Sequence, residues 1–159
     1  MNGNFDIKKP WFWLATWFGC GLARPAPGTW GTLGGLPFGI FLMMFGGPVW
    51  LAAAAIIVFA AGLWAAREFE KATGEHDSSA IVIDEVAGVW VTLLAATQTP
   101  LSVLLAFLLF RAFDILKPWP VSWCDKKLPG AWGVMMDDIA AGIFAAASLY
   151  LLRTYAGIG

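Results

Sequence analysis

Five long apolar segments constrain the fold of this chain more than any other feature of its sequence. They cover residues 33–45, 48–66, 86–97, 101–110 and 139–152. Hydrophobic residues make up 59% of the 159 residues, above the level of about 45–50% that is usual for globular domains. A single domain of this length could not bury so much apolar surface, so the sequence predicts a membrane protein.

These segments show no strand-like alternation of apolar and polar residues. A backbone that faces lipid must satisfy its own hydrogen bonds, which favours helices. We therefore predict an all-α fold, a small polytopic integral membrane helical bundle with short or broken helices. Only residues 48–66 approach the roughly 20 residues that a spanning helix needs. The shorter segments tilt, extend through their flanks or form a re-entrant hairpin, and the number of membrane passes stays open.

We expect one membrane-embedded domain over residues 1–159. Lys8-Lys9 and the apolar stretch behind them imitate a signal peptide, but the tryptophans of that stretch favour an uncleaved interfacial helix. The expected parts are an interfacial N-terminal segment with a Pro/Gly turn (1–32), a helical hairpin (33–66), an acidic loop (67–85), a broken helical block (86–113), a polar loop (114–138) and a C-terminal helix (139–156).

Positive charges lie almost entirely in the polar connections. Arg153 is the exception, in the last helix or tail. If each broken apolar block crosses the membrane and returns, the other nine lie on one face, which the positive-inside rule assigns to the cytoplasm. The same arrangement places residues 67–85 beside residues 111–138 and predicts a polar cytoplasmic-face active site. The nine are Lys8, Lys9, Arg24, Arg67, Lys71, Arg111, Lys117, Lys126 and Lys127.

The remaining composition excludes some classes of protein. The net charge is −1 and no basic stripe is present, so no nucleic acid is expected as a partner. Cys20 and Cys124 are far apart and have no metal-ligand spacing, so neither a zinc site nor a disulfide framework is indicated. The sequence gives no indication of an oligomeric state.

Two acidic pairs, Asp84-Glu85 and Asp137-Asp138, each precede an apolar segment, and a glycine follows each pair after about one helical turn. One acidic residue at a helix start is ordinary capping. Two such pairs at one membrane face indicate a cation site, because close carboxylates repel each other unless a cation neutralises them. Carboxylate oxygens are ligands that suit Mg2+.

Arg111, Asp114 and Lys117 recur every three residues and therefore share one face of a helix, which Pro118 then disfavours from continuing. Arg111 can bind phosphate oxygens through two N–H groups, and Lys117 can act as a point charge. Asp114 would orient Arg111 or complete the metal shell. An internal Arg–Asp ion pair at the membrane interface explains the same pattern equally well.

A Pro/Gly turn after Arg24 leads into an expected helix start, where Gly28, Thr29 and Thr32 can present N–H groups and hydroxyls to an anion. The turn lacks the lysine and spacing of a P-loop, so nucleotide binding is not indicated. Taken alone, such a stretch is more often only a turn.

His76 is the only histidine in the chain and lies beside Asp77. A lone histidine is usually structural. Within an acidic segment, however, His76 can act as an acid or base, or be oriented by the neighbouring carboxylate.

Together these segments resemble the bacterial phosphatidylglycerophosphatase A family, from Trp11 to about Tyr150. Several ordered motifs with similar intervals are more specific than any one of them. The motifs are Pro27-Gly28-Thr29, His76-Asp77, Ile81-Val82-Ile83-Asp84-Glu85, Arg111-Ala112-Phe113-Asp114, Lys117-Pro118-Trp119-Pro120, and Gly133-Val134-Met135-Met136-Asp137-Asp138 ending at Gly142.

The resemblance implies a Mg2+-dependent phosphoric monoester hydrolase of the bacterial inner membrane, which converts phosphatidylglycerol phosphate into phosphatidylglycerol and phosphate in phospholipid biosynthesis. For that reaction we predict the metal ligands Asp84, Glu85, Asp114, Asp137 and Asp138. The predicted catalytic residues are His76, Asp77, Asp84, Asp137, Arg111 and Lys117. The predicted substrate-binding residues are Arg24, Gly28, Thr29, Thr32, Arg111 and Lys117. The number of metal ions, and whether water or a carboxylate is the nucleophile, stay open.

Two alternatives remain beside this reading. One is another lipid-phosphate phosphatase, although the histidine-based enzymes of that class need more than one histidine. The other is a non-enzymatic small membrane cation carrier or assembly subunit. A carrier should place carboxylates near the middle of the bilayer, whereas these acidic pairs precede the apolar segments.

Overall fold

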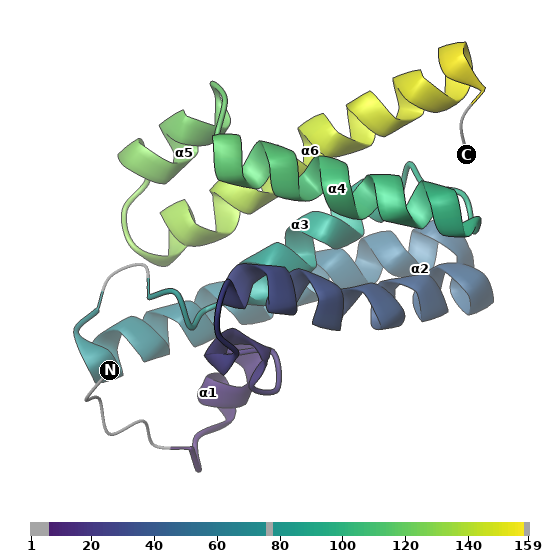
Figure 1. The fold of residues 1–159 in the computed structure, drawn as a ribbon. Helices are drawn as coiled ribbons and strands as arrows, with labels where there is room; N and C mark the ends of the chain where they lie inside the picture. The colour runs from purple at the N-terminus through teal and green to yellow at the C-terminus, as the bar shows by residue number, and fades with distance from the viewer. Residues whose placement is uncertain (1–6, 76–77, 158–159) are drawn as a thin grey trace.

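The computed structural model describes residues 7–75 and 78–157, which form helices and connecting turns without any strand (Figure 1). The predicted all-α class is therefore confirmed for the described residues. The elements in chain order are α1 (Pro10–Ala15), the 3-10 helix η1 (Cys20–Leu22), α2 (Pro27–Thr73), α3 (Ile83–Leu93), α4 (Pro100–Leu116), α5 (Val121–Lys127) and α6 (Ala131–Ala156).

α2 is a hairpin of two helical arms that meet at Gly47. This residue has φ 73° and ψ −172°, a conformation that interrupts the helix and that glycine adopts readily. Pro48 follows, at a position where proline is well tolerated because the first turn of a helix leaves its N–H groups unpaired. We call residues 27–46 the first arm and residues 48–73 the second arm. Figure 1 shows the two arms running in opposite directions.

Both arms pack on α3. Gly31 lies against Val82, just before α3, and Gly39 lies against Trp90 near its end, so the first arm runs parallel to α3. The indole N–H of Trp90 also donates a hydrogen bond of 2.8 Å to the Gly35 carbonyl. The second arm returns in the opposite direction and lies against the first residue of α3 at its own Gly62.

α3 and α6 are in direct backbone contact at Gly88 and Gly142. A Cβ on Gly88 would lie 2.7 Å from the carbonyl oxygen of Asp138, and a Cβ on Gly142 would collide with the Gly88 carbonyl. The Thr92 hydroxyl adds a hydrogen bond of 3.3 Å to the Gly142 carbonyl. Because each acidic pair precedes its glycine by about one turn, this contact brings the two pairs together.

The outer surface of the bundle is largely apolar. Phe45, Val49 and Ile56 are 76%, 77% and 70% exposed, and large exposed apolar surfaces mark contact with lipid or protein. Among the described residues, α2 and α6 are the helices long and apolar enough to cross a membrane. α3 has 11 residues and rises only about 16 Å, roughly half of a hydrocarbon core of about 30 Å.

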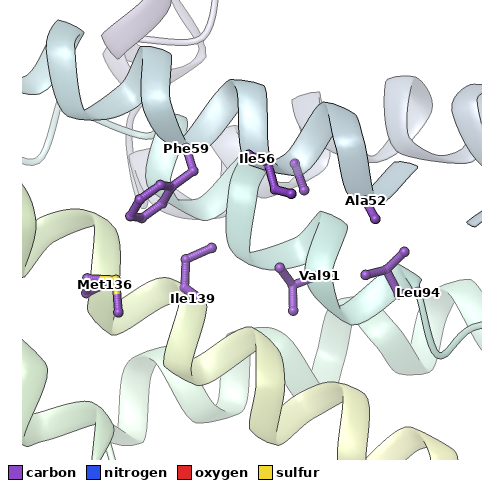
Figure 2. A pocket seen from close by; sticks show the side chains of 8 residues that line it. Ala52, Ile56, Phe59, Val91, Leu94, Met136 and Ile139 are labelled. Atoms are coloured by element: carbon purple, nitrogen blue, oxygen red, sulfur yellow. The ribbon is translucent and has the colours of Figure 1, made fainter. Parts of the chain in front are cut away.

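An apolar groove of about 390 Å³ lies between the second arm and α6, with α3 as its floor (Figure 2). Ile56 and Phe59 of the second arm face Ile139 and Met136 of α6 across it. All of its lining side chains are apolar, so the groove has no group suited to binding a phosphate or a cation. The lining residues are Ala52, Ala55, Ile56, Phe59, Val91, Leu94, Met136 and Ile139.

The acidic loop expected over residues 67–85 is shorter than predicted. Residues 67–73 continue the second arm as helix, because Phe69 is fully buried, stacks on Phe12 of α1 and makes an edge-to-face contact with Trp11. Tertiary packing of this kind usually decides where a helix ends. Gly74, in the left-handed conformation, ends the helix.

The polar loop expected over residues 114–138 is also mostly helical. α4 continues to Leu116, α5 follows, and α6 begins at Ala131 instead of residue 139. Burial of Val134 and Met135 stabilises this earlier start. Asp137 and Asp138 therefore lie in the second turn of α6, where adjacent side chains point about 100° apart.

Candidate active site

A polar cavity of about 270 Å³ lies at the end of the bundle where α2, α3 and α6 begin and α4 ends. Segments far apart in the sequence therefore meet at one site. The lining residues are Ala26, Pro27, Gly28, Ser78, Ser79, Ile81, Asp84, Glu85, Arg111, Asp114, Lys117, Val134, Asp137 and Asp138.

Three carboxylates form the centre of this cavity. Asp84, Glu85 and Asp138 each offer an oxygen, and these oxygens lie within 4.8 Å of one another. Asp84 and Asp138 are only 8% and 3% exposed. The Oε2 atom of Glu85 is buried without a hydrogen-bond partner, as expected for an oxygen that is arranged to bind a cation. This all-oxygen set fits a hard divalent cation.

Burial disfavours the charged forms of these carboxylates. It raises the pKa of Asp84 well above its usual value, and the adjacent charge of Glu85 adds to the rise. Burial also raises the pKa of Glu85 to about 8. The side-chain interaction with Asp84 opposes this rise, the charges of Asp138 and Asp114 add to it, and the charge of Arg111 opposes it more weakly. A bound cation would reverse this effect, because it favours the ionised carboxylates.

Arg111 lies beside the carboxylate cluster and is held from three directions. Its Nη1 atom lies 2.6 Å from Asp114 Oδ2 and 3.9 Å from Glu85 Oε1, and it donates a hydrogen bond of 3.4 Å to Thr32 Oγ1. The Nε atom is buried and has no partner. Arg111 is therefore held at a fixed place in the wall of the cavity.

Gly28 allows the first arm to approach Arg111 and Glu85 closely. A Cβ at this position would collide with Glu85 Oε1 and would lie 3.1 Å from Arg111 Nη1. The Thr32 hydroxyl donates a hydrogen bond of 2.8 Å to the Gly28 carbonyl and accepts one from Arg111. It therefore connects the Gly28 backbone to the guanidinium. The start of α2 thus forms one wall of the cavity.

Lys117 ends α4 in the left-handed conformation, with φ 42° and ψ 56°. Its Nζ atom donates hydrogen bonds of 2.7 Å to Asp137 Oδ2 and 2.5 Å to Asp125 Oδ1. Burial alone would lower the pKa of Lys117, but these two carboxylates outweigh it and raise the pKa above the usual lysine value. Lys117 is therefore a fixed positive charge at the cavity wall.

The structure divides the five predicted metal ligands into two groups. Asp84, Glu85 and Asp138 form the cluster, whereas Asp114 is paired with Arg111 and Asp137 with Lys117. The division of the second acidic pair follows from its position inside a helix, where neighbouring side chains point in different directions.

The predicted substrate-binding residues are also separated. Gly28, Arg111 and Lys117 line the cavity, but Arg24 and Thr29 do not, and Thr32 is buried behind Arg111. His76 and Asp77 lie outside the described residues. The sequence analysis did not predict Asp125, which accepts a hydrogen bond from Lys117. Pro118 and Pro120, which follow Lys117 and end the helix, are the sequence feature that indicates a turn bringing later residues back to it.

Known proteins match this chain over nearly its whole length. The family model described as phosphatidylglycerophosphatase A matches residues 13–153. A phosphatidylglycerophosphatase A of Escherichia coli strain K12 is 36% identical over 99% of this chain and 92% of its own length. Its namesake in Haemophilus influenzae is 38% identical over 96% of this chain and 98% of its own.

A third relative carries a different name. It is a Bacteroides thetaiotaomicron protein, provisionally named as a phosphatidylinositol-3-phosphatase, that is 39% identical over 95% of this chain and 100% of its own length. No solved structure matches the chain significantly.

Proposed function

Because this chain belongs to the phosphatidylglycerophosphatase A family, we propose that it hydrolyses phosphatidylglycerol phosphate to phosphatidylglycerol and phosphate with the help of Mg2+. The observation that carries the proposal is the cavity in which Asp84, Glu85 and Asp138 gather beside Arg111 and Lys117. A carboxylate cluster that can hold a divalent cation, next to two basic side chains, suits a dianionic phosphomonoester, because hydrolysis of such an ester requires neutralisation of its charge.

Each group has a distinct role in this proposal. A divalent cation held by Asp84, Glu85 and Asp138 would supply a Lewis acid for the phosphoryl group. Arg111 binds phosphoryl oxygens and stabilises the negative charge on them in the transition state. Lys117 donates to another oxygen as a point charge.

The reaction consumes one water molecule. The water oxygen forms a bond to phosphorus as the bond from phosphorus to the glycerol oxygen breaks. Asp137, whose Oδ2 atom accepts a hydrogen bond from Lys117, takes one proton from the water. That proton then passes through solvent to the departing glycerol oxygen, which restores the Asp137 carboxylate and leaves the second water proton on the phosphate. The acyl chains stay in the lipid beside the apolar helices.

The activity is tested with purified protein in detergent, by assay of phosphate released from phosphatidylglycerol phosphate. We expect release with Mg2+ and a loss of at least about 100-fold when EDTA removes the metal, because a Lewis acid contributes several kcal/mol to such reactions and about 1.4 kcal/mol corresponds to tenfold. Equal rates with Mg2+ and with EDTA would contradict the metal-dependent reaction.

A substrate panel tests the headgroup. It compares phosphatidylglycerol phosphate with phosphatidic acid, lysophosphatidic acid and phosphatidylinositol 3-phosphate, the last because of the name of the Bacteroides relative. We expect the highest kcat/KM with phosphatidylglycerol phosphate. Preference for another member of the panel would retain a lipid phosphatase and overturn the substrate.

We further propose a multi-pass protein of the bacterial inner membrane with the cavity at the cytoplasmic side. The first arm has about 20 residues and a length of about 30 Å, so its start and the Gly47 turn match the two faces of the apolar layer. The cavity lies at the start of that arm. Arg153 donates a hydrogen bond to the Ala95 carbonyl near the opposite end. The other nine basic residues lie before the start of α2, in the last turns of α2 and α4, directly after α4, or in α5.

Cysteine labelling tests this orientation. In a background without Cys20 and Cys124, Lys127→Cys places a thiol on exposed α5 and Thr154→Cys places one on the exposed far end of α6. We expect a membrane-impermeant maleimide to label Thr154→Cys in intact spheroplasts and Lys127→Cys only after lysis. The reverse pattern would place the cavity outside, and labelling of both in intact spheroplasts would contradict a membrane crossing by α6.

A further inference from the structure

Lys117 has two carboxylate partners of different kinds. Asp137 lines the cavity, whereas Asp125 lies in α5, outside the residues that line it. Their distances from Lys117 Nζ are 2.7 Å and 2.5 Å. The side chain of Asp125 is 28% exposed, so it reaches Lys117 from the solvent side while Asp137 reaches it from within the cavity.

α5 offers a firm support for this second contact. Val121 is fully buried and Cys124 is 8% exposed, and both face inward from this short helix. The chain between Lys117 and α5 contains Pro118 and Pro120, which restrict the backbone. Asp125 is therefore held at one place, in the last turn of α5.

A lysine needs such support to act on a phosphate. Its side chain has four flexible carbons, and its ammonium carries three N–H donors. Asp125 and Asp137 accept from two donors and leave the third for a phosphate oxygen. Without Asp125, the ammonium would keep only its 2.7 Å hydrogen bond to Asp137, and the flexible side chain could rotate its remaining N–H groups away from the phosphoryl group.

We propose that Asp125 is a positioning residue, which holds Lys117 at the cavity wall so that its remaining N–H points at the phosphoryl group of the substrate. The inference rests on the proposed function, since Lys117 acts on the phosphoryl group there. In this proposal Asp125 itself contacts neither the substrate nor the carboxylate cluster of Asp84, Glu85 and Asp138.

The first test is Asp125→Asn, which keeps the shape of the side chain and removes its charge. We expect kcat/KM to fall about 10-fold, the lower end of the effect of losing a group that orients a functional ligand, mainly through a higher KM. The Mg2+ concentration that gives half-maximal rate should not change, because the three clustered carboxylates are intact. Asp125→Glu should recover part of the loss, and Lys126→Gln, an exposed change on the same helix, should match the wild type.

A double-mutant cycle separates positioning from a general structural role. In a Lys117→Met background, Asp125→Asn should change kcat/KM less than twofold, because the lysine that it positions is gone. An equal loss in both backgrounds would overturn the proposal and give Asp125 a structural role. A wild-type rate for Asp125→Asn alone would also overturn it.

A binding measurement keeps the inference distinct from the proposed function. Inorganic phosphate with Mg2+ should raise the thermal unfolding temperature of the wild type and do so less for Asp125→Asn at the same concentration. If the wild type hydrolyses no lipid phosphate, the proposed function fails while this comparison still tests the positioning. Equal phosphate-dependent shifts in the two proteins would overturn the positioning alone.

Discussion

Replacing Asp138 by asparagine is expected to lower kcat at saturating lipid by at least about 100-fold. Asp138 contributes one of three clustered carboxylate oxygens and is 3% exposed, so water cannot easily take its place. Even outer partners of metal ligands affect activity by about 10–100-fold, and a direct ligand should have a larger effect. The measurement is phosphate release over a range of Mg2+ concentrations, where the variant should need more metal for half-maximal rate.

The stability of the same variant should change in the opposite direction. Without metal, three buried carboxylates at close range disfavour one another, so Asp138→Asn should unfold in EDTA at the same temperature as the wild type or higher. With Mg2+ at 100 times its dissociation constant, the wild type should gain about 2.7 kcal/mol and the variant much less. Thermal unfolding in detergent, with and without Mg2+, measures both differences.

The matched control is Glu68→Gln, which neutralises a carboxylate of α2 whose partner is the exposed Lys71. A surface ion pair contributes about 0–1 kcal/mol, so its rate and its Mg2+ response should follow the wild type. If Asp138→Asn keeps both the wild-type rate and the wild-type Mg2+ response, the cluster does not bind the metal that the reaction uses.

Much of the carboxylate cluster could be predicted from local sequence, because its residues come from two copies of the same short pattern. An acidic pair followed by a glycine about one turn later occurs at Asp84-Glu85 and at Asp137-Asp138. The glycines let α3 and α6 touch at Gly88 and Gly142, and that contact sets the acidic side chains together. The pattern therefore carries both the ligands and the packing that assembles them.

The division of the second pair depends on an element boundary that hydropathy does not reveal. Because α6 already begins at Ala131, Asp137 and Asp138 lie inside the helix and not in the loop before it. Their side chains then point in directions about 100° apart, and only Asp138 joins the cluster. With the helix starting at residue 139, both carboxylates would have been free to bind one cation.

Asp125 shows a second limit of reasoning from periodicity. It lies eight residues after Lys117, which is not a contact spacing in a continuous helix. The two residues meet because α4 ends at Lys117 and the proline-containing turn leads into α5. Contacts made across such a turn depend on its three-dimensional path, for which the sequence offers only the breakers and not the direction.

Arg111→Lys is the second substitution from which we expect a large loss, about 100- to 1000-fold in kcat/KM, comparable to the removal of one donor to a developing oxyanion. The change keeps the positive charge, so long-range attraction of the phosphate survives. It removes the planar fork of N–H groups that binds two oxygens at once. Arg111 is held by Asp114 and Thr32, and a lysine ammonium cannot satisfy these partners and the substrate with the same geometry.

The matched control is Arg67→Lys, the same chemical change at an exposed position where the guanidinium lies 5.9 Å from the Trp132 ring centroid. This variant should keep the wild-type kcat/KM and show at most a small change in unfolding temperature. For Arg111→Lys, unfolding in detergent distinguishes a catalytic loss from a structural one. A folded variant with a wild-type rate would assign Arg111 to an internal ion pair with Asp114. A folded variant with the expected loss would assign its guanidinium to the phosphoryl group, because a neighbouring positive charge alone does not replace two directed hydrogen bonds.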